Sequence, residues 1–226
     1  MEFTQLSHAL ATAEDETSRL QMIVDSAPVL IPGCDHAGVT LNSRGGVVTR
    51  VSSDDVVRRA NELQYELDEG PCLNMRRDQD TLVSNDLTNE DRWARWAKHV
   101  HADLRVHSMM SLLIYTDRTS FGALSLYASR AQGFDADDVA IGQGLAGHLA
   151  VIMAAGREID QLGTAVHNRT IIGQAQGILM SRLNIDADQA FDYLRRISSH
   201  SNRKLVEVAA EIAGTRELPE GSYTWT

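Results

Sequence analysis

The stretch that decides the architecture of the C-terminal region is RTIIGQAQGILMSRL, residues 169–183. Its apolar side chains recur every three or four residues, which is the spacing of one face of an α-helix. Residues 186–198 and 203–213 repeat this period, and Gly214 is placed to end the last segment. Because narrow apolar stripes are buried most readily against one another, the sequence predicts a small all-α unit of three helices.

A long helix is predicted immediately before this unit. No proline lies between residues 71 and 219, and apolar residues recur at intervals of three or four from Leu145 to Val166. The simplest interpretation is a helix from about residue 136 to residue 163 or beyond, with a seam close to a heptad repeat. Its first half either packs on a sheet or joins the seam, whereas beyond Ala155 self-association is preferred. Residues 136–168 are therefore expected to link two domains and to carry the coiled-coil seam of a homodimer.

Residues 1–155 show a different pattern, in which short apolar runs flank turns. These runs predict two β-hairpins, with strands at 37–41 and 47–51 and at 108–115 and 122–128. Helical segments are expected at 16–31 and 54–67, a short strand at 81–84, and a loop followed by a helix over 86–100. The combination indicates an α+β fold, in which helices flank a mostly antiparallel sheet.

The net charge of −10 by itself argues against nucleic acid as a partner. The charge is uneven, however. Residues 1–160 hold 14 basic against 24 acidic side chains, whereas residues 161–226 hold seven of each. Within residues 169–204 six basic side chains accompany three acidic ones. The sequence therefore joins an acidic body to a mildly basic C-terminal unit, and only the latter is suited to bind a polyanion.

The composition, 43% hydrophobic and 23% charged, is that of a soluble globular protein. The longest weakly polar stretch, residues 142–156, contains Gln143 and His148 and is shorter than the roughly 20 residues that span a bilayer. The N-terminus lacks the basic and apolar regions of a signal peptide. Two cysteines make no disulfide framework. A cytoplasmic protein with no membrane partner is expected.

Three linked blocks of sequence mark the C-terminal unit. They are Arg169-x-x-Ile172-x-x-Ala175-x-Gly177-Ile178-Leu179-Met180, Ala190-Phe191-x-x-Leu194-Arg195 and Asn202-Arg203-Lys204-Leu205-x-x-Val208-Ala209. Residues 162–214 resemble the ANTAR domain, a small RNA-binding antiterminator module of bacterial regulators. The family usually has Ala-Lys-Gly where this chain has Ala175-Gln176-Gly177, so one cation of the expected RNA face is missing. Residues 215–226 are expected to be a loose tail.

The resemblance implies binding to paired hairpin loops in nascent transcripts, which prevents a terminator from forming and places the protein near RNA polymerase. Recognition of RNA loops needs cations for phosphates and small residues that allow close approach. Two hairpins need two modules presented together, which a parallel helical homodimer supplies. The simpler alternative is that Arg195 and Arg196 form a solvated helix face and that Asn202 only caps a helix. The candidate RNA-binding residues are Ala175, Gln176, Gly177, Arg182, Arg195, Arg196, Asn202, Arg203 and Lys204.

The N-terminal region carries a second set of motifs. They are Gln64-Tyr65-Glu66-Leu67-x-Glu69-Gly70-Pro71-Cys72-Leu73, Ala37-Gly38-Val39, Asp91-Arg92-Trp93 and Gly122-Ala123-Leu124-x-Leu126-Tyr127. They resemble a GAF domain of the kind joined to ANTAR modules in actinobacteria. Such domains are sensors with a pocket beside an antiparallel sheet, so the resemblance implies a small-molecule ligand or signal for residues 1–155. Cys34, Cys72 and Trp93 are the candidate sensor residues.

No catalytic residue, metal site or cofactor is predicted. A GAF-fold enzyme that reduces free methionine sulfoxide uses cysteines near its pocket, but such an enzyme needs no RNA module. His99 and His101 would point to different faces of a helix, which disfavours a metal site. The prediction is a signal-responsive RNA-binding regulator of transcription antitermination that is not an enzyme. Two alternatives stay open: a DNA-binding regulator in which residues 205–212 begin a helix-turn-helix, and a sensor that acts through protein partners.

Overall fold

The computed structural model describes residues 3–13, 15–43, 46–74, 80–117 and 119–217. Most of the predicted tail, 215–226, and the tips of the two predicted hairpins, at 44–45 and 118, lie outside these ranges. The chain divides into two compact units, Met1–Gly156 (unit 1) and Arg157–Thr226 (unit 2). Helix α6, Ala136–Leu183, contributes residues to both.

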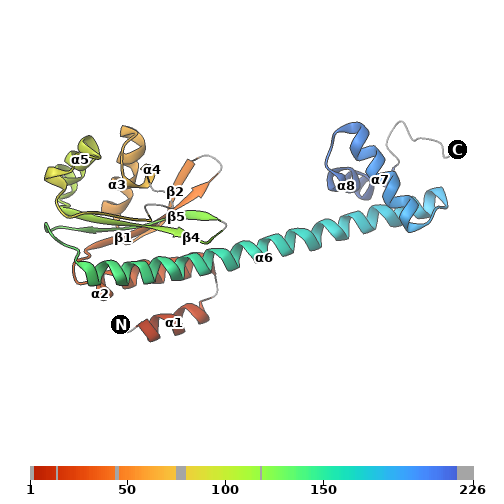
Figure 1. Ribbon diagram of the computed structural model, residues 1–226. Helices are drawn as coiled ribbons and strands as arrows, with labels where there is room; N and C mark the ends of the chain where they lie inside the picture. Colours follow the sequence, from red (N-terminus) through yellow and green to blue (C-terminus); the bar gives the residue numbers. More distant parts are fainter. Residues whose placement is uncertain (1–2, 14, 44–45, 75–79, 118, 218–226) are drawn as a thin grey trace. The chain divides into compact units, whose positions relative to one another are not determined.

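A five-stranded antiparallel sheet forms the centre of unit 1, with the strand order β2-β1-β5-β4-β3 (Figure 1). The two predicted hairpins are β1–β2 and β4–β5, and β1 pairs with β5 between them. A Cβ atom on Gly122 of β5 would lie 1.8 Å from the Thr40 carbonyl oxygen, so only glycine allows this strand pairing. The strands are β1 (His36–Ser43), β2 (Gly46–Ser52), β3 (Thr81–Ser84), β4 (Ser108–Tyr115) and β5 (Ser120–Ala128).

Helices cover both faces of this sheet (Figure 1). Alternate residues of a strand point to opposite faces, so Met110 of β4 packs with α2 and α6, whereas Met109 and Tyr127 pack with α3 and α5. The sequence pattern does not predict α1, whose Leu6 and Leu10 join the first of these clusters. The helices of this unit that precede α6 are α1 (Phe3–Thr12), α2 (Glu16–Leu30), α3 (Asp55–Leu67), α4 (Pro71–Asn74), the 3₁₀ turn η1 (Leu87–Asn89) and α5 (Ala94–Leu104).

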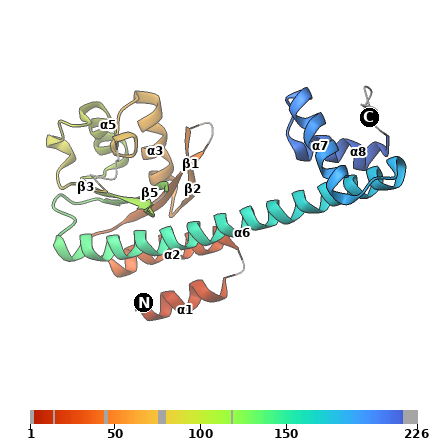
Figure 2. The same ribbon diagram turned by 45° about the vertical axis from the view of Figure 1, so that its right-hand side comes forward.

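Helix α6 is longer than the sequence pattern predicts. It continues through residues 169–183, so the first helix of the predicted three-helix unit is the end of the linking helix (Figure 2). Gly163 and Gly173 lower the helical propensity locally but do not end the helix, and no proline follows either of them within it. In its first half Leu145 and Leu149 are fully buried in the cluster under the sheet. Of the two alternatives for this half, packing on the sheet is confirmed.

Unit 2 closes around its own apolar core. The end of α6 packs with α7 (Ala187–Ser201) and α8 (Leu205–Thr215). Asp186 and Gln189 form a reciprocal capping box at the start of α7, as their spacing predicts. The last helix runs past Gly214, and Arg216 in the left-handed conformation is its C-cap, so the predicted end at Gly214 is wrong. The core residues are Ala175, Leu179, Ala190, Tyr193, Leu194, Val208, Ala209 and Ile212.

Within the described part of the chain one helix, α6, is long and apolar enough to cross a membrane by length and composition alone. The helix continues beyond residues 142–156 on both sides, so the length of this element no longer argues against a span. Leu145, Leu149 and Ala150 of α6 lie in the core against the sheet. A core helix of a soluble domain passes the same test of length and composition, so α6 is weak evidence for a membrane.

Candidate nucleic-acid interface

The exposed surface of unit 2 holds most of the side chains that the sequence proposes for RNA binding. The capping box at Asp186 and the left-handed Asn202 fix the two ends of α7, at φ 53° for Asn202. The short connection from Asn202 to Lys204 then leads into α8, so three candidate residues are adjacent in one turn. All three side chains are exposed, and Lys204 precedes α8 without capping it through its side chain. This turn can therefore present two cations and one amide to a ligand.

Two of the candidate arginines form ion pairs with carboxylates of unit 2. Arg195 lies 3.4 Å from Asp192 one turn earlier in α7, and Arg203 lies 2.6 Å from Glu211 of α8. These pairs are largely exposed, so each contributes about 1 kcal/mol or less to stability. An incoming phosphate can replace the carboxylate at little cost. Arg196 is also exposed on α7.

The structure places Ala175 and Gln176 differently from the sequence interpretation. Ala175 is fully buried in the core of unit 2, so its methyl group has no surface with which to meet RNA. Gln176 is half-buried, and its amide nitrogen donates a hydrogen bond to the Ala187 carbonyl oxygen at 3.0 Å. That bond ties α6 to the first turn of α7. Ala175 therefore leaves the candidate set, and Gln176 has a role in joining two helices.

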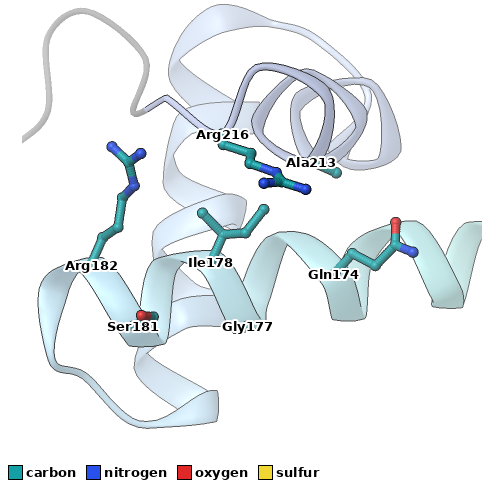
Figure 3. Close-up of a pocket in the computed structure, with 7 residues that line it drawn as sticks. All are labelled: Gln174, Gly177, Ile178, Ser181, Arg182, Ala213 and Arg216. Atoms are coloured by element: carbon teal, nitrogen blue, oxygen red, sulfur yellow. The ribbon is translucent and has the colours of Figure 1, made fainter.

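Gly177 and Arg182 line an open cleft of about 600 Å³ between α6 and the end of α8 (Figure 3). Three polar side chains that the sequence interpretation missed lie there as well, those of Gln174, Ser181 and Arg216. Because Gly214 is expected to end the last helix, the sequence offers no reason to place Arg216 in a site. A signal existed nonetheless, since cations are favoured at helix C-termini. This space is called the α6–α8 cleft below, and its lining residues are Gln174, Gly177, Ile178, Ser181, Arg182, Ala213 and Arg216.

The candidate sensor residues of unit 1 do not form one site. Cys34 is buried, and burial raises the pKa of its thiol to about 12, which keeps it protonated and unreactive. Trp93 is 2% exposed and packs edge-on against Trp96, at 6.2 Å between ring centroids. Both residues therefore occupy the core. Cys72 is half-buried and lies elsewhere, beside the sheet.

Polar side chains surround the Cys72 sulfur. The Gln64 amide nitrogen lies 3.4 Å from it, and the hydroxyl oxygens of Thr40 and Ser125 lie at 3.8 and 3.6 Å. Gln64 also accepts a hydrogen bond from the Cys72 backbone N–H at 2.8 Å, which fixes α4 against α3. A cavity of about 50 Å³ lined by Thr40 and Cys72 adjoins this group. Its volume suits a few water molecules.

Two family profiles match the chain. The GAF domain matches residues 13–154, and the ANTAR domain matches residues 160–212. Among curated proteins no sequence matches. The domain matches coincide with the five-stranded sheet and with the helical module, respectively.

Several solved structures share the fold of unit 1. The GAF domain of a phosphoenolpyruvate-protein phosphotransferase from Coxiella burnetii superposes with a TM-score of 0.55 at 14% identity, over 70% of this chain and 94% of that one. A domain of a putative sensor histidine kinase from Sinorhizobium meliloti gives 0.52 at 12% identity, over 64% and 94%. Free methionine-R-sulfoxide reductase from Neisseria meningitidis gives 0.50 at 17% identity, over 69% and 88%. At these identities the likeness concerns the fold alone.

Proposed function

The chain belongs to the GAF domain family and carries an ANTAR domain after it, and from this premise we propose that it binds paired hairpin loops in nascent mRNA and promotes transcription antitermination. ANTAR domains are RNA-binding antitermination modules and GAF domains are sensor modules. The chain is accordingly a signal-responsive regulator. Both domains are regulatory rather than catalytic, and both are typically soluble domains of the cytoplasm.

One observation supports the RNA-binding proposal most strongly. The three helices of unit 2 pack around a shared apolar core and leave their arginine and lysine side chains on the surface, although the chain as a whole has a net charge of −10. Exposed cations on a closed module are what phosphate contacts require. The proposed contact residues are Gln176, Gly177, Arg182, Arg195, Arg196, Asn202, Arg203 and Lys204.

Helix α6 supports the proposal of a homodimer. Ile159, Leu162 and Val166 are 67%, 61% and 66% exposed, at intervals of three and four residues. Large apolar side chains at such spacing on an exposed helix are typical of a coiled-coil seam. Leu149 is buried under the sheet, so the proposed seam begins after it, and Val151, 69% exposed, lies on the same stripe. A dimer would present two RNA-binding modules and bind two hairpins with the gain of avidity.

The proposed domain limits follow the sequence interpretation: a sensor domain over 1–155, a linking helix over 136–168 and an RNA-binding domain over 162–214. The proposed signal is a small molecule that binds unit 1, the sensor domain. To change RNA binding, this small molecule must favour one of two conformations of α6. It can do so only if it binds the protein more tightly in one conformation than in the other. Proximity to RNA polymerase follows from binding to nascent transcripts.

The test compares nucleic acids on the full chain. RNA hairpins with six-nucleotide loops of randomised sequence are selected on the protein, and the enriched pair is measured against duplex DNA of equal length across a salt series. Tight hairpin binding that weakens steeply with salt is expected. Preference for duplex DNA would favour a DNA-binding regulator. Failure to bind either nucleic acid would favour a sensor that acts through protein partners.

Single substitutions test where RNA contacts unit 2. Lys204→Ala and Arg196→Ala should each weaken hairpin binding and lower the salt dependence by about one phosphate contact. Arg157→Ala is the matched control, because it removes an exposed cation of α6 that precedes the matched ANTAR residues. If all three variants bind like the parent chain, the RNA face lies elsewhere on the protein. The folded fraction is checked by circular dichroism.

A further inference from the structure

The α6–α8 cleft combines features that a closed helical core does not need (Figure 3). Its walls are the exposed side of α6 and the C-terminal end of α8. Ile178 and Ala213 supply apolar surface, and Gln174 and Ser181 supply hydrogen-bonding groups. The matched ANTAR residues end at 212, so Ala213 and Arg216 lie beyond the family match. The cleft therefore combines five residues of the matched ANTAR region with two from the helix end beyond it.

The charge of the α6–α8 cleft is uniformly positive. Of the seven described residues that line it, two are arginines and none is acidic. Arg216 is held at the helix end by its left-handed backbone, and its N–H donates to the Ile212 carbonyl oxygen at 2.9 Å. Figure 3 shows Arg182 rising from the end of α6 and Arg216 lying between α8 and Ile178. Two planar guanidinium groups beside an apolar wall are suited to a phosphate and the face of a base.

Gly177 keeps the α6–α8 cleft open. A Cβ atom at this position would meet no other atom within 4 Å, so packing within the described chain does not require glycine here. Glycine inside a helix lowers stability by about 0.5–1 kcal/mol relative to alanine. A residue that costs stability without a packing reason, in the wall of a positively charged cleft, points to a ligand that approaches the helix backbone.

We infer that the α6–α8 cleft receives one unpaired nucleotide of the bound RNA loop. The base lies over Gly177 and against Ile178, and Gln174 and Ser181 meet its edge. Arg182 and Arg216 hold the phosphate beside it. Sequence-specific recognition of RNA targets unpaired bases that leave the stack, and arginine planes and apolar side chains are the surfaces that receive them. This inference rests on the proposed function and adds Gln174, Ser181 and Arg216 to the RNA-binding residues.

The decisive variant fills the cleft without removing a charge. Gly177→Leu places an aliphatic side chain in the α6–α8 cleft and should weaken binding of the selected hairpin by roughly fivefold to 100-fold, the range for the loss of one stacked base. Gly147→Leu is the matched control, because Gly147 is also an exposed α6 glycine with open space around it but lies outside the cleft and before the proposed seam. The control should bind like the parent chain. Both variants should keep or raise the unfolding temperature, because leucine favours helix.

A second variant tests the phosphate contact. Arg216→Ala should weaken hairpin binding and reduce the slope of log affinity against log salt by about one, whereas Arg157→Ala should change neither. A 2-aminopurine base placed at each loop position in turn reports which base leaves the stack. At one loop position the 2-aminopurine fluorescence should rise when the RNA binds the parent chain. It should not rise with the Gly177→Leu variant.

The outcomes separate this inference from the proposed function. If the parent chain selects no hairpin, the proposed function fails. If the parent chain binds and Gly177→Leu, Arg216→Ala and the controls bind alike, the function stands and the cleft is not a nucleotide site. If Gly177→Leu instead shifts the monomer–dimer equilibrium in sedimentation, the cleft contacts a second copy of the chain and the inference is overturned. If Gly177→Leu fails to fold, the inference is tested by Arg216→Ala and by the 2-aminopurine scan on the parent chain. It is overturned if Arg216→Ala binds like the parent chain and no loop base leaves the stack.

Discussion

Helix α6 uses the same apolar spacing in two opposite ways. Leu145 and Leu149 are fully buried against the sheet of unit 1, whereas Leu162 and Val166 are more than 60% exposed. A period of three or four residues identifies a face of a helix but not what covers it. The difference teaches that the first half of α6 is part of a folded core, whereas the second half leaves large apolar side chains exposed within one chain.

Truncation of one leucine in each half gives the largest contrast. Leu149→Ala should lower the free energy of unfolding of unit 1 by about 2–5 kcal/mol, because it leaves a cavity in a packed core. Measured on the chain diluted to a monomer, Leu162→Ala should change it by about 0.5 kcal/mol or less, since within one chain this side chain is exposed and lies outside unit 1. Urea unfolding followed by the fluorescence of Trp93 and Trp96 measures both. Equal losses would mean that the second half of α6 is buried as well.

A charge in the exposed stripe tests the proposed partner. Leu162→Glu should convert the dimer into a monomer and weaken binding to a pair of hairpins by about 100-fold through lost avidity, while binding to one hairpin stays the same. The control is Gln161→Glu, which adds the same charge to the same helix at an exposed polar position. Light scattering gives the mass. If the parent chain is a monomer at the concentrations at which it binds RNA, the proposed coiled-coil dimer is wrong.

Carboxylates show the same contrast between the two units. In unit 1 the Glu90 side chain is 6% exposed and holds Arg92, and hydrogen bonds from Arg92 lower the pKa of Glu90 to about 2. In unit 2 the Glu211 side chain, which pairs with Arg203, is 45% exposed. The Glu90 carboxylate is thus part of the buried structure, whereas the Glu211 carboxylate lies on the surface. Replacing Glu90 should therefore lower the free energy of unfolding more than replacing Glu211.

Glu90→Gln should destabilise unit 1 at pH 7 by about 2 kcal/mol, the range for hydrogen bonds to a charged group. Because the folded pKa lies below the unfolded one, this stabilisation is present above about pH 4.5 and is lost as the pH falls toward 2. The difference between Glu90→Gln and the parent chain should therefore shrink on acidification. Glu211→Gln is the matched control and should cost about 1 kcal/mol or less. Thermal unfolding at pH 7 and pH 3 measures both, and a gap that stays constant with pH would contradict the assignment.

Local patterns predicted the elements well and the sites less well. Strand pairs around short turns, the capping box at Asp186 and the helical periods depend on neighbours in sequence, and all are present in the structure. Whether Ala175 faces a core or a ligand depends instead on where α7 and α8 lie, which no local pattern records. The same holds for Trp93, which is 2% exposed within the core cluster that α3, α5 and the sheet share. Arg216 was missed because Gly214 resembles a helix end, although the helix continues one residue beyond it.

Two buried tyrosines give the smallest and most direct contrast. In unit 1 the Tyr127 hydroxyl donates to the Asn61 side-chain oxygen at 3.4 Å. In unit 2 the Tyr193 hydroxyl is buried with no hydrogen-bond partner among the described residues, and burial raises the pKa of its phenol. Tyr127→Phe should cost about 1 kcal/mol, because it removes one of the two donors to the Asn61 oxygen and leaves only the Gln64 amide at 3.3 Å. Tyr193→Phe should be neutral or stabilise unit 2 by up to about 1 kcal/mol, since it removes a desolvated hydroxyl that gains nothing. Calorimetry of the two variants measures the signs, and a loss of stability from Tyr193→Phe would show that its hydroxyl has a partner in solution, such as an ordered water.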